Sequence, residues 1–219
     1  MKWNSIETFF LDMDGTILDL AYDDYFWHYH IPALHAAKNK ITLNAAKLEF
    51  EERYKKRKNT IQWYSLDFWS NELNIKLNEE LIKTKDKIKV LPGVKEFLNQ
   101  LKKRGIKIIL LTNCPRTMLH VKLTQTKLWG YFYEIISSED FGYPKESDNF
   151  WTILKEKITY RENKTIFIDD SLNILKYAHK NGINKVIGIN YPDSKKTKQV
   201  INDFESLDNI SLFERKFID

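Results

Sequence analysis

Two aspartates stand two residues apart at the end of an apolar run. Asp12 and Asp14 follow Phe9-Phe10-Leu11 and precede Gly15-Thr16. Side chains alternate across a strand, so residues two apart point to the same side, and glycine lets the backbone turn sharply. A buried carboxylate without a partner is costly. The pair therefore indicates a bound cation or proton-transfer chemistry, and the alternative is an ordinary Asp-Gly turn capped by the second aspartate.

Three further polar clusters follow apolar segments that have the pattern of strands. Thr112-Asn113 follows residues 106–111, Gly142-Tyr143-Pro144-Lys145 comes after Ile135-Ile136, and Asp169-Asp170 follows residues 165–168. In open parallel sheets, ligands bind outside the carboxyl ends of the strands. We therefore expect the four clusters to converge on one phosphate and metal site.

Alternation of helix and strand patterns up to about residue 189 predicts an α/β fold, with a parallel sheet flanked by helices. Residues 17–90 contain no convincing strand and are expected to form a helical insertion, in which Thr42 and Asn78 are expected N-caps. A helix is predicted over residues 94–104, closed by Gly105. The polar segment after Pro192 is expected to pack as a tail, and the sequence leaves its shape open.

Composition limits the class of protein. The chain has 219 residues, 42% of them hydrophobic, one cysteine and a formal net charge of +5. A single cysteine excludes an intrachain disulfide framework and suits a reducing compartment. No leader-like apolar segment and no stretch of roughly 20 apolar residues is present. We expect a soluble cytoplasmic protein, a monomer or homodimer, that binds neither membrane nor nucleic acid and attracts small anions.

The order and spacing of the four clusters resemble the four motifs of the haloacid dehalogenase-like hydrolase superfamily, in its phosphatase branch. The resemblance extends to the bacterial GMP/IMP nucleotidase family. It implies a Rossmann-like catalytic core of residues 1–17 and 90–219 and a mobile α-helical cap of residues 18–89. The segments that carry the closer resemblance are LDMDGTILDLAYDDYFW (11–27), QWYSLDFWSNELNI (62–75), ILLTN (109–113), VKLTQTKL (121–128), FGYPKES (141–147), FIDDSLNIL (167–175) and NYPDS (190–194).

The resemblance implies roles for the motif residues. Asp12 matches the nucleophile that forms an aspartyl-phosphate, and Asp14 matches the general acid and base. The single-displacement dehalogenases of this superfamily lack the second aspartate, so Asp14 favours a phosphate substrate over a halide substrate. Thr112 and the backbone of Asn113 match the group that holds the phosphoryl oxygens, together with Lys145.

A magnesium ion is implied by the same resemblance, since Mg²⁺ prefers hard oxygen ligands. The match places one Asp12 oxygen, the Asp14 main-chain carbonyl and Asp170 on the metal, with Asp169 further out or bound through water. Neighbours on an extended chain point oppositely, so only one of the adjacent aspartates should reach the ion simply. Lys145 is the only evident cation to balance these carboxylates. An acidic pair at a helix N-terminus is the alternative interpretation of residues 169–170.

Large aromatic residues gather in two parts of the insertion. At helical spacing such rings are usually core, but a small helical cap rarely needs so many, and base–aromatic stacking contributes ~1–3 kcal/mol. With the family resemblance, this predicts a purine nucleotide substrate, IMP or GMP, in preference to AMP or a sugar phosphate. The rings are Tyr22, Tyr25, Phe26 and Trp27, then Trp63, Tyr64, Phe68 and Trp69.

Two other functions remain open from the sequence. One is a phosphatase or phosphomutase of the same fold that acts on a small sugar phosphate, because a fold does not fix the substrate. The other is a receiver-like phosphoacceptor domain, which also uses aspartates, threonine and lysine on a parallel sheet. In receivers the acidic pair follows the first strand, whereas here it follows the fourth.

Several other features are expected to have no catalytic role. Arg53–Lys58 is interpreted as a solvated helix face. His28, His30 and His35 lack the partners and spacing of a metal site and are expected in the core or at the surface. Cys114 has no evident base partner and is expected to be incidental.

Overall fold

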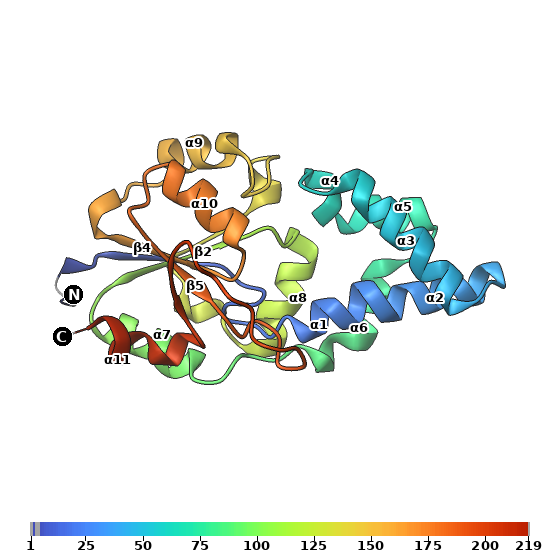
Figure 1. The fold of residues 1–219 in the computed structure, drawn as a ribbon, viewed down its shortest axis with the longest axis horizontal. Coiled ribbons are helices and arrows are strands. Elements are labelled where there is room, and N and C mark those ends of the chain that lie inside the picture. The colour runs from blue at the N-terminus through green and yellow to red at the C-terminus, as the bar shows by residue number, and fades with distance from the viewer. Residues whose placement is uncertain (1, 3–4, 219) are drawn as a thin grey trace.

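The six strands form one parallel sheet in the order β3-β2-β1-β4-β5-β6 (Figure 1), in a computed structural model that describes residue 2 and residues 5–218. The predicted α/β class is confirmed. Residues 1, 3, 4 and 219, which the predicted core includes, lie outside the described residues. The strands are β1 (Thr8–Leu11), β2 (Lys107–Thr112), β3 (Glu134–Ser137), β4 (Thr165–Asp169), β5 (Lys185–Ile189) and β6 (Glu205–Leu207).

Helices cover both faces of the sheet, because both sets of alternating strand side chains are apolar. Phe9 and Leu11 belong to one buried cluster, and Phe10 belongs to the other. The first cluster includes residues of α7 (Val94–Lys103), α8 (Arg116–Thr126) and α11 (Phe213–Phe217). The second includes residues of α9 (Asp148–Lys157) and α10 (Leu172–Lys180), which lie on the opposite side of the sheet in Figure 1.

The position of β1 determines where a ligand can bind. β1 pairs in parallel with β2 on one side and with β4 on the other. The chain first adds β2 and β3 on one side of β1 and then crosses to add β4, so the strand order reverses next to β1. Crevices in open α/β sheets form at this reversal, outside the carboxyl ends of the strands. Asp12 and Asp169–Asp170 stand at these ends.

The insertion between β1 and β2 is helical among its described residues, as predicted. An antiparallel bridge between Leu18 and Val90 joins the points where the chain leaves and re-enters the core. Figure 1 shows the helices extending away from one end of the sheet. The insertion contains α1 (Ala21–Tyr25), a π-helical turn (Phe26–His30), α2 (Ile31–Asn39), α3 (Leu43–Arg57), α4 (Ile61–Tyr64), α5 (Leu66–Leu73), α6 (Leu77–Thr84) and a 3₁₀ turn (Lys85–Lys87).

One of the two expected N-caps is present. The Thr42 hydroxyl accepts a hydrogen bond from the backbone N–H of Ala45 at the start of α3. The Asn78 prediction is wrong, because α6 begins at Leu77, its N-cap is Lys76, and Asn78 lies inside the helix. In residue 2 and residues 5–218, no helix is long and apolar enough to cross a membrane.

The segment after Pro192 completes the sheet, which the sequence pattern did not indicate. β6 pairs in parallel with β5, and its Leu207 is buried. α11 then places Phe213 and Phe217 in the cluster that contains Phe9, and the Phe9 and Phe213 rings meet edge to face at 5.1 Å. The tail therefore adds an edge strand to the sheet, and its helix covers part of one face.

Candidate active site

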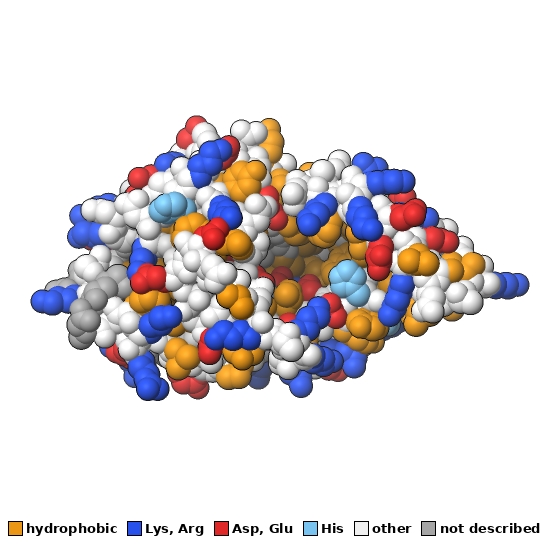
Figure 2. Space-filling model, viewed as in Figure 1, with side chains coloured by type: hydrophobic (Ala, Val, Ile, Leu, Met, Phe, Trp, Pro, Cys, Tyr) orange, Lys and Arg blue, Asp and Glu red, His pale blue; other side chains and the backbone are white. Residues whose placement is uncertain are grey.

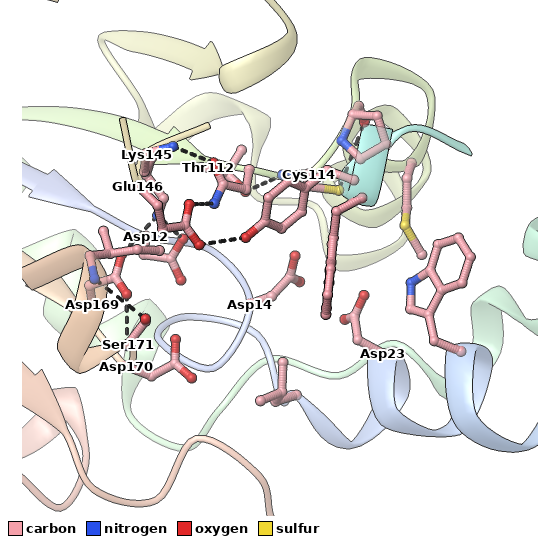
Figure 3. Close-up of a pocket in the computed structure, with 18 of the residues that line it drawn as sticks. Asp12, Asp14, Asp23, Thr112, Cys114, Lys145, Glu146, Asp169, Asp170 and Ser171 are labelled. Atoms are coloured by element: carbon pink, nitrogen blue, oxygen red, sulfur yellow. Dashed lines mark hydrogen bonds and ion pairs between the residues drawn. The ribbon is translucent and has the colours of Figure 1, made fainter. Parts of the chain in front are cut away.

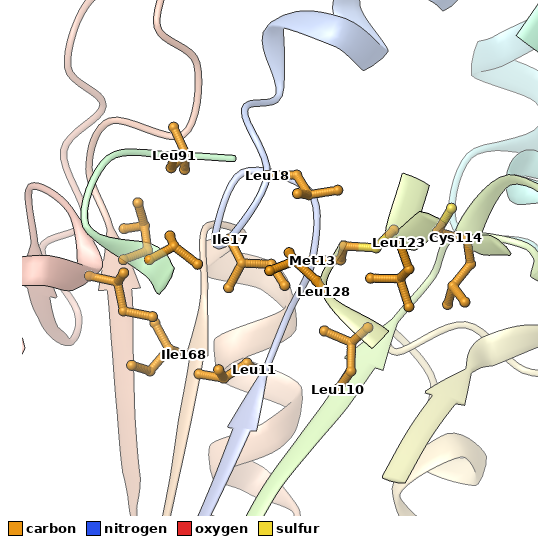
Figure 4. Packing of buried hydrophobic residues seen from close by; sticks show 14 of the residues in the cluster. Leu11, Met13, Ile17, Leu18, Leu91, Leu110, Cys114, Leu123, Leu128 and Ile168 are labelled. Atoms are coloured by element: carbon orange, nitrogen blue, oxygen red, sulfur yellow. The ribbon is translucent and has the colours of Figure 1, made fainter. Parts of the chain in front are cut away.

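The loop after β1 directs its carboxylates away from the core because its apolar residues are anchored in it. Met13, Ile17 and Leu18 are buried (Figure 4), and the Met13 carbonyl accepts hydrogen bonds from the backbone of Ile17 and Leu18 at 3.0 and 2.8 Å. Alternation then leaves Asp12 and Asp14 on the other side, where both line one cavity. Their predicted common orientation is confirmed.

Lys145 joins three of the four sequence clusters. Its ammonium lies 2.5 Å from Asp12 Oδ1 and 2.7 Å from Asp169 Oδ2, and it donates to the Leu111 carbonyl at 3.0 Å. The side chain is fully buried, and its three donors are all used within the protein. Burial favours the neutral amine, but the two carboxylates outweigh it and raise the pKa of Lys145. In this arrangement a single ammonium lies between the two carboxylates of Asp12 and Asp169.

The adjacent aspartates have different surroundings, which Figure 3 shows. Asp169 pairs with Lys145 and also accepts the backbone N–H of Ser171 at 2.8 Å. The Asp170 carboxylate lies against Gly15, where a Cβ would stand 2.6 Å from its Cγ. Asp169 is thus held by protein groups, and Asp170 is directed at the loop after β1.

These carboxylates have the chemistry of a site for a divalent cation. Oxygens of Asp12, Asp169 and Asp170 lie within 4.8 Å of one another. Burial raises the pKa of Asp12 to about 8, against the effect of Lys145, and the charge of Asp169 adds to the rise. Burial, with the charges of Asp169 and Asp12, also raises the pKa of Asp170 well above its usual range. A hard cation would supply the missing positive charge, so this donor set fits Mg²⁺.

Thr112 and Asn113, at the end of β2, build the third side of the site. The Thr112 hydroxyl accepts the backbone N–H of Cys114 at 3.0 Å. The Asn113 side chain accepts the backbone N–H of Lys145 at 2.9 Å and donates to Glu146 at 2.8 Å. Asn113 therefore fixes the loop that carries Lys145.

Glu146 connects this loop to the insertion, a role the sequence analysis did not identify. Tyr64, at the end of α4, donates its hydroxyl to Glu146 Oε1 at 2.7 Å, while Asn113 holds Oε2. Burial, followed by the Glu146 charge, raises the pKa of Tyr64, so the hydroxyl stays a donor. Glu146 follows Lys145 directly in the third motif, and this was the only available sequence signal.

A second buried lysine corrects the expectation that Lys145 alone balances the carboxylates. Lys122 of α8 lies 2.7 Å from Asp14 Oδ1 and 2.7 Å from each oxygen of Asp23 in α1. Its side chain is 1% exposed. Neither Lys122 nor Asp23 belongs to the four polar clusters. Both lie in segments that carry the closer family resemblance, 121–128 and 11–27, but the sequence analysis gave neither a role.

The insertion closes the site into a cavity of about 290 Å³, and Figure 2 shows the hollow with apolar and acidic side chains in it. The carboxylates and Lys145 form one wall. Apolar and aromatic side chains form the other. The Tyr54 hydroxyl donates to the Trp27 carbonyl, and the Trp69 indole N–H donates to the Trp63 carbonyl. The insertion contributes Leu20, Trp27, His28, Tyr54, Trp63 and Trp69 to the second wall, and the core residues Pro115, Met118 and Ile174 also line the cavity.

The eight aromatic residues of the two predicted clusters divide between core and cavity. Four of them line the cavity: Trp27, Trp63, Tyr64 and Trp69. The other four pack elsewhere: Tyr22 and Phe26 are buried, Tyr25 stacks on His30, and Phe68 lies under Arg57. The core interpretation therefore holds for Tyr22 and Phe26, and also for Trp69, which is buried in the core cluster although it lines the cavity.

Two of the features expected to lack a catalytic role, His28 and Cys114, line the cavity, whereas His30 and His35 do not. His30 pairs with Glu80 at 2.8 Å and His35 with Glu49 at 3.0 Å. Within the described residues, the group that could hold a metal contains no histidine. Arg53–Lys58 is mainly exposed apart from Tyr54. Burial raises the pKa of the Cys114 thiol well above its usual range.

The fold and the carboxylate site are those of a known enzyme class. The family model described as "haloacid dehalogenase-like hydrolase" matches residues 6–182, and the chain belongs to this family. A structure titled as a HAD phosphatase from Thermococcus onnurineus superposes with a TM-score of 0.79 at 20% identity, over 96% of this chain and 97% of the other. A predicted phosphoglycolate phosphatase from Haemophilus somnus gives 0.69 at 18% identity, over 96% and 97%.

A closer relative narrows the class. The chain is 37% identical over 194 residues to the GMP/IMP nucleotidase YrfG of Escherichia coli K12, covering 89% of this chain and 87% of that protein. With the family match, this identifies the chain as a phosphomonoesterase. The receiver-like alternative is thereby set aside.

Proposed function

We propose that this phosphatase hydrolyses purine nucleoside 5′-monophosphates, with GMP and IMP preferred, through an aspartyl-phosphate and with Mg²⁺ bound. The observation that carries the proposal is one cavity whose two walls differ: carboxylates with Lys145 on one, aromatic rings on the other. The relative that is named a GMP/IMP nucleotidase supports the same substrate.

In the first step, an Asp12 oxygen attacks phosphorus and the bond to the ribose 5′-oxygen breaks. Asp14 gives its proton to that oxygen, so the nucleoside leaves as an alcohol. In the second step, Asp14 takes a proton from water as the water attacks the aspartyl-phosphate, which releases phosphate and restores Asp12. Lys145 favours the ionised form of Asp12 against the effect of burial, and Thr112 with the Asn113 backbone would hold phosphoryl oxygens.

Asp12, Asp170 and the Asp14 main-chain carbonyl would hold the magnesium ion, with Asp169 oriented behind them by Lys145. The bound ion supplies charge that neutralises the phosphoryl oxygens. Chelation should abolish activity, and calcium should restore it poorly because its coordination is looser. Full activity in excess chelator would contradict the metal proposal.

Base recognition is assigned to the insertion, which we propose acts as a cap of residues 18–89 over a core of 1–17 and 90–219. Trp27 and Trp63 are half-buried at the cavity, so their faces are available to a purine. Tyr54 and Trp69 are buried and pack edge to face at 4.9 Å, which supports the wall. A cytoplasmic location is part of the proposal, and the free cysteine suits it. We expect the enzyme to act as a monomer or homodimer.

The test is kcat/KM for IMP, GMP, AMP, UMP and glucose 6-phosphate, each with and without magnesium. IMP and GMP should be the best substrates. Equal values for AMP and IMP would remove the claim of a 6-oxopurine preference. A higher value for the sugar phosphate would favour the second candidate, a sugar-phosphate phosphatase or phosphomutase, and would assign the rings to cap packing.

A further inference from the structure

Lys122 is a buried cation in a place where the proposed phosphoryl-transfer steps give it no direct task. It is fully buried, and lysine is almost never fully buried unless paired. Its pairing is complete: Asp14 Oδ1, Asp23 Oδ1 and Asp23 Oδ2 all lie 2.7 Å from its ammonium. Nearby carboxylates outweigh desolvation, so the pKa of Lys122 is raised and the group stays charged.

The three residues come from three different parts of the fold. Asp14 belongs to the loop after β1, Asp23 to the first helix of the insertion, and Lys122 to α8 beside the sheet. Lys122 therefore holds a core carboxylate and a carboxylate of the insertion at the same point. The Tyr22 ring lies 5.7 Å from the ammonium and adds a second contact from α1.

The contact holds the Asp14 carboxyl through one of its oxygens. Oδ1 lies 2.7 Å from the Lys122 ammonium, and the Asp23 carboxyl also lies within hydrogen-bonding reach of Asp14. The Asp14 side chain is 20% exposed and lines the cavity, between the Asp12 cluster and Asp23 in Figure 3. A carboxyl group fixed through one oxygen presents the other in a defined direction.

We propose that Lys122, itself anchored by Asp23, is a positioning residue that aims the Asp14 carboxyl at the leaving oxygen of the substrate. Lys122 touches neither substrate nor metal and acts through Asp14. Because Asp23 is in the insertion, the geometry of the acid depends on how the insertion sits on the core. The inference rests on the proposed role of Asp14.

Leaving-group dependence tests this role, because a poor leaving group needs the proton and a good one does not. The measurement is kcat/KM for the alkyl phosphate that the protein hydrolyses best and for p-nitrophenyl phosphate, with magnesium saturating. Lys122→Met should lower the alkyl value about 100-fold, the scale of a misplaced catalytic group, and the aryl value less than about fivefold. Asp23→Asn, which keeps the Lys122–Asp14 pair, should change the ratio in the same direction by about tenfold.

A matched control lies one residue away. Asp24 lies in α1 next to Asp23 and pairs with Lys196 of the core. Asp24→Asn therefore removes an ion pair between the insertion and the core but leaves the contacts of Asp14 in place. It should leave the alkyl-to-aryl ratio unchanged. Asp14→Asn separates the two hypotheses: if it leaves the ratio unchanged, the acid role of Asp14 is wrong. If Asp14→Asn changes the ratio, but Lys122→Met and Asp23→Asn lower kcat/KM equally for both substrates, the positioning role is refuted.

Discussion

Gly15→Ala perturbs the proposed metal site without removing any charge. Gly15 has a φ of +85°, and an added Cβ would lie 2.6 Å from both Cγ and Oδ2 of Asp170. Ordinary contacts begin at 3.4 Å, so the carboxylate must move by 3.4 − 2.6 = 0.8 Å. Displacing a group at a metal site by this much is expected to cost roughly 10–100-fold in metal affinity, the range known for perturbed outer-shell partners.

The substitution also strains the backbone, and this loss of stability must be distinguished from the effect on the metal site. A side chain at positive φ costs roughly 1–2 kcal/mol, and the loss of unfolded-state entropy returns about 0.4–1 kcal/mol. The net loss is about 1 kcal/mol, or ~2–4 °C in Tm for a chain of this length. Gly105→Ala is the matched control, because its φ is +69° and nothing lies within 4 Å of its added Cβ.

The assay is phosphate release at a fixed substrate concentration across a magnesium titration, with Tm measured in parallel. The Tm of both variants should fall by a similar few degrees. Gly15→Ala alone should need about 10–100 times more magnesium for half-maximal rate. If both variants titrate like the wild type, Asp170 does not hold the ion in the geometry argued above.

Three further outcomes are expected. Asp12→Asn should keep the fold and lose more than about 1,000-fold in rate, while Asp14→Asn allows slow phosphorylation at best; a larger residual rate for Asp12→Asn rules out the covalent route. Asp170→Ala should raise the magnesium requirement more than Asp169→Ala, and the reverse order would exchange their roles. Burial raises the pKa of Asp12 from 3.8 to about 8, so the metal-free folded state binds the extra proton and loses stability as pH rises through 6–8. The Tm in chelator should fall over that range more for wild type than for Asp12→Asn, and equal slopes would contradict the assignment.

The sequence by itself determined the class of fold and the proposed chemistry. Strand-forming apolar runs and the polar residues that follow them are local patterns, and parallel strands bring their carboxyl ends to one edge. Asp12, Thr112, Lys145 and Asp169–Asp170 could therefore be assembled before any coordinates, and the structure places them around one cavity. The helical insertion was likewise predicted, because its helical spacing and lack of strand patterns are local properties.

Only the tertiary structure decided which other residues meet at the site. Lys122 lies within an ordinary helical segment, and its burial depends on which face of α8 packs against the loop after β1. Tyr64 and Glu146 are 82 residues apart, and their contact depends on how the insertion sits on the core. The tail after Pro192 has little apolar periodicity, and β6 forms because the edge of β5 is available to pair with it. These features depend on contacts between distant segments, and local sequence patterns carry no record of such contacts.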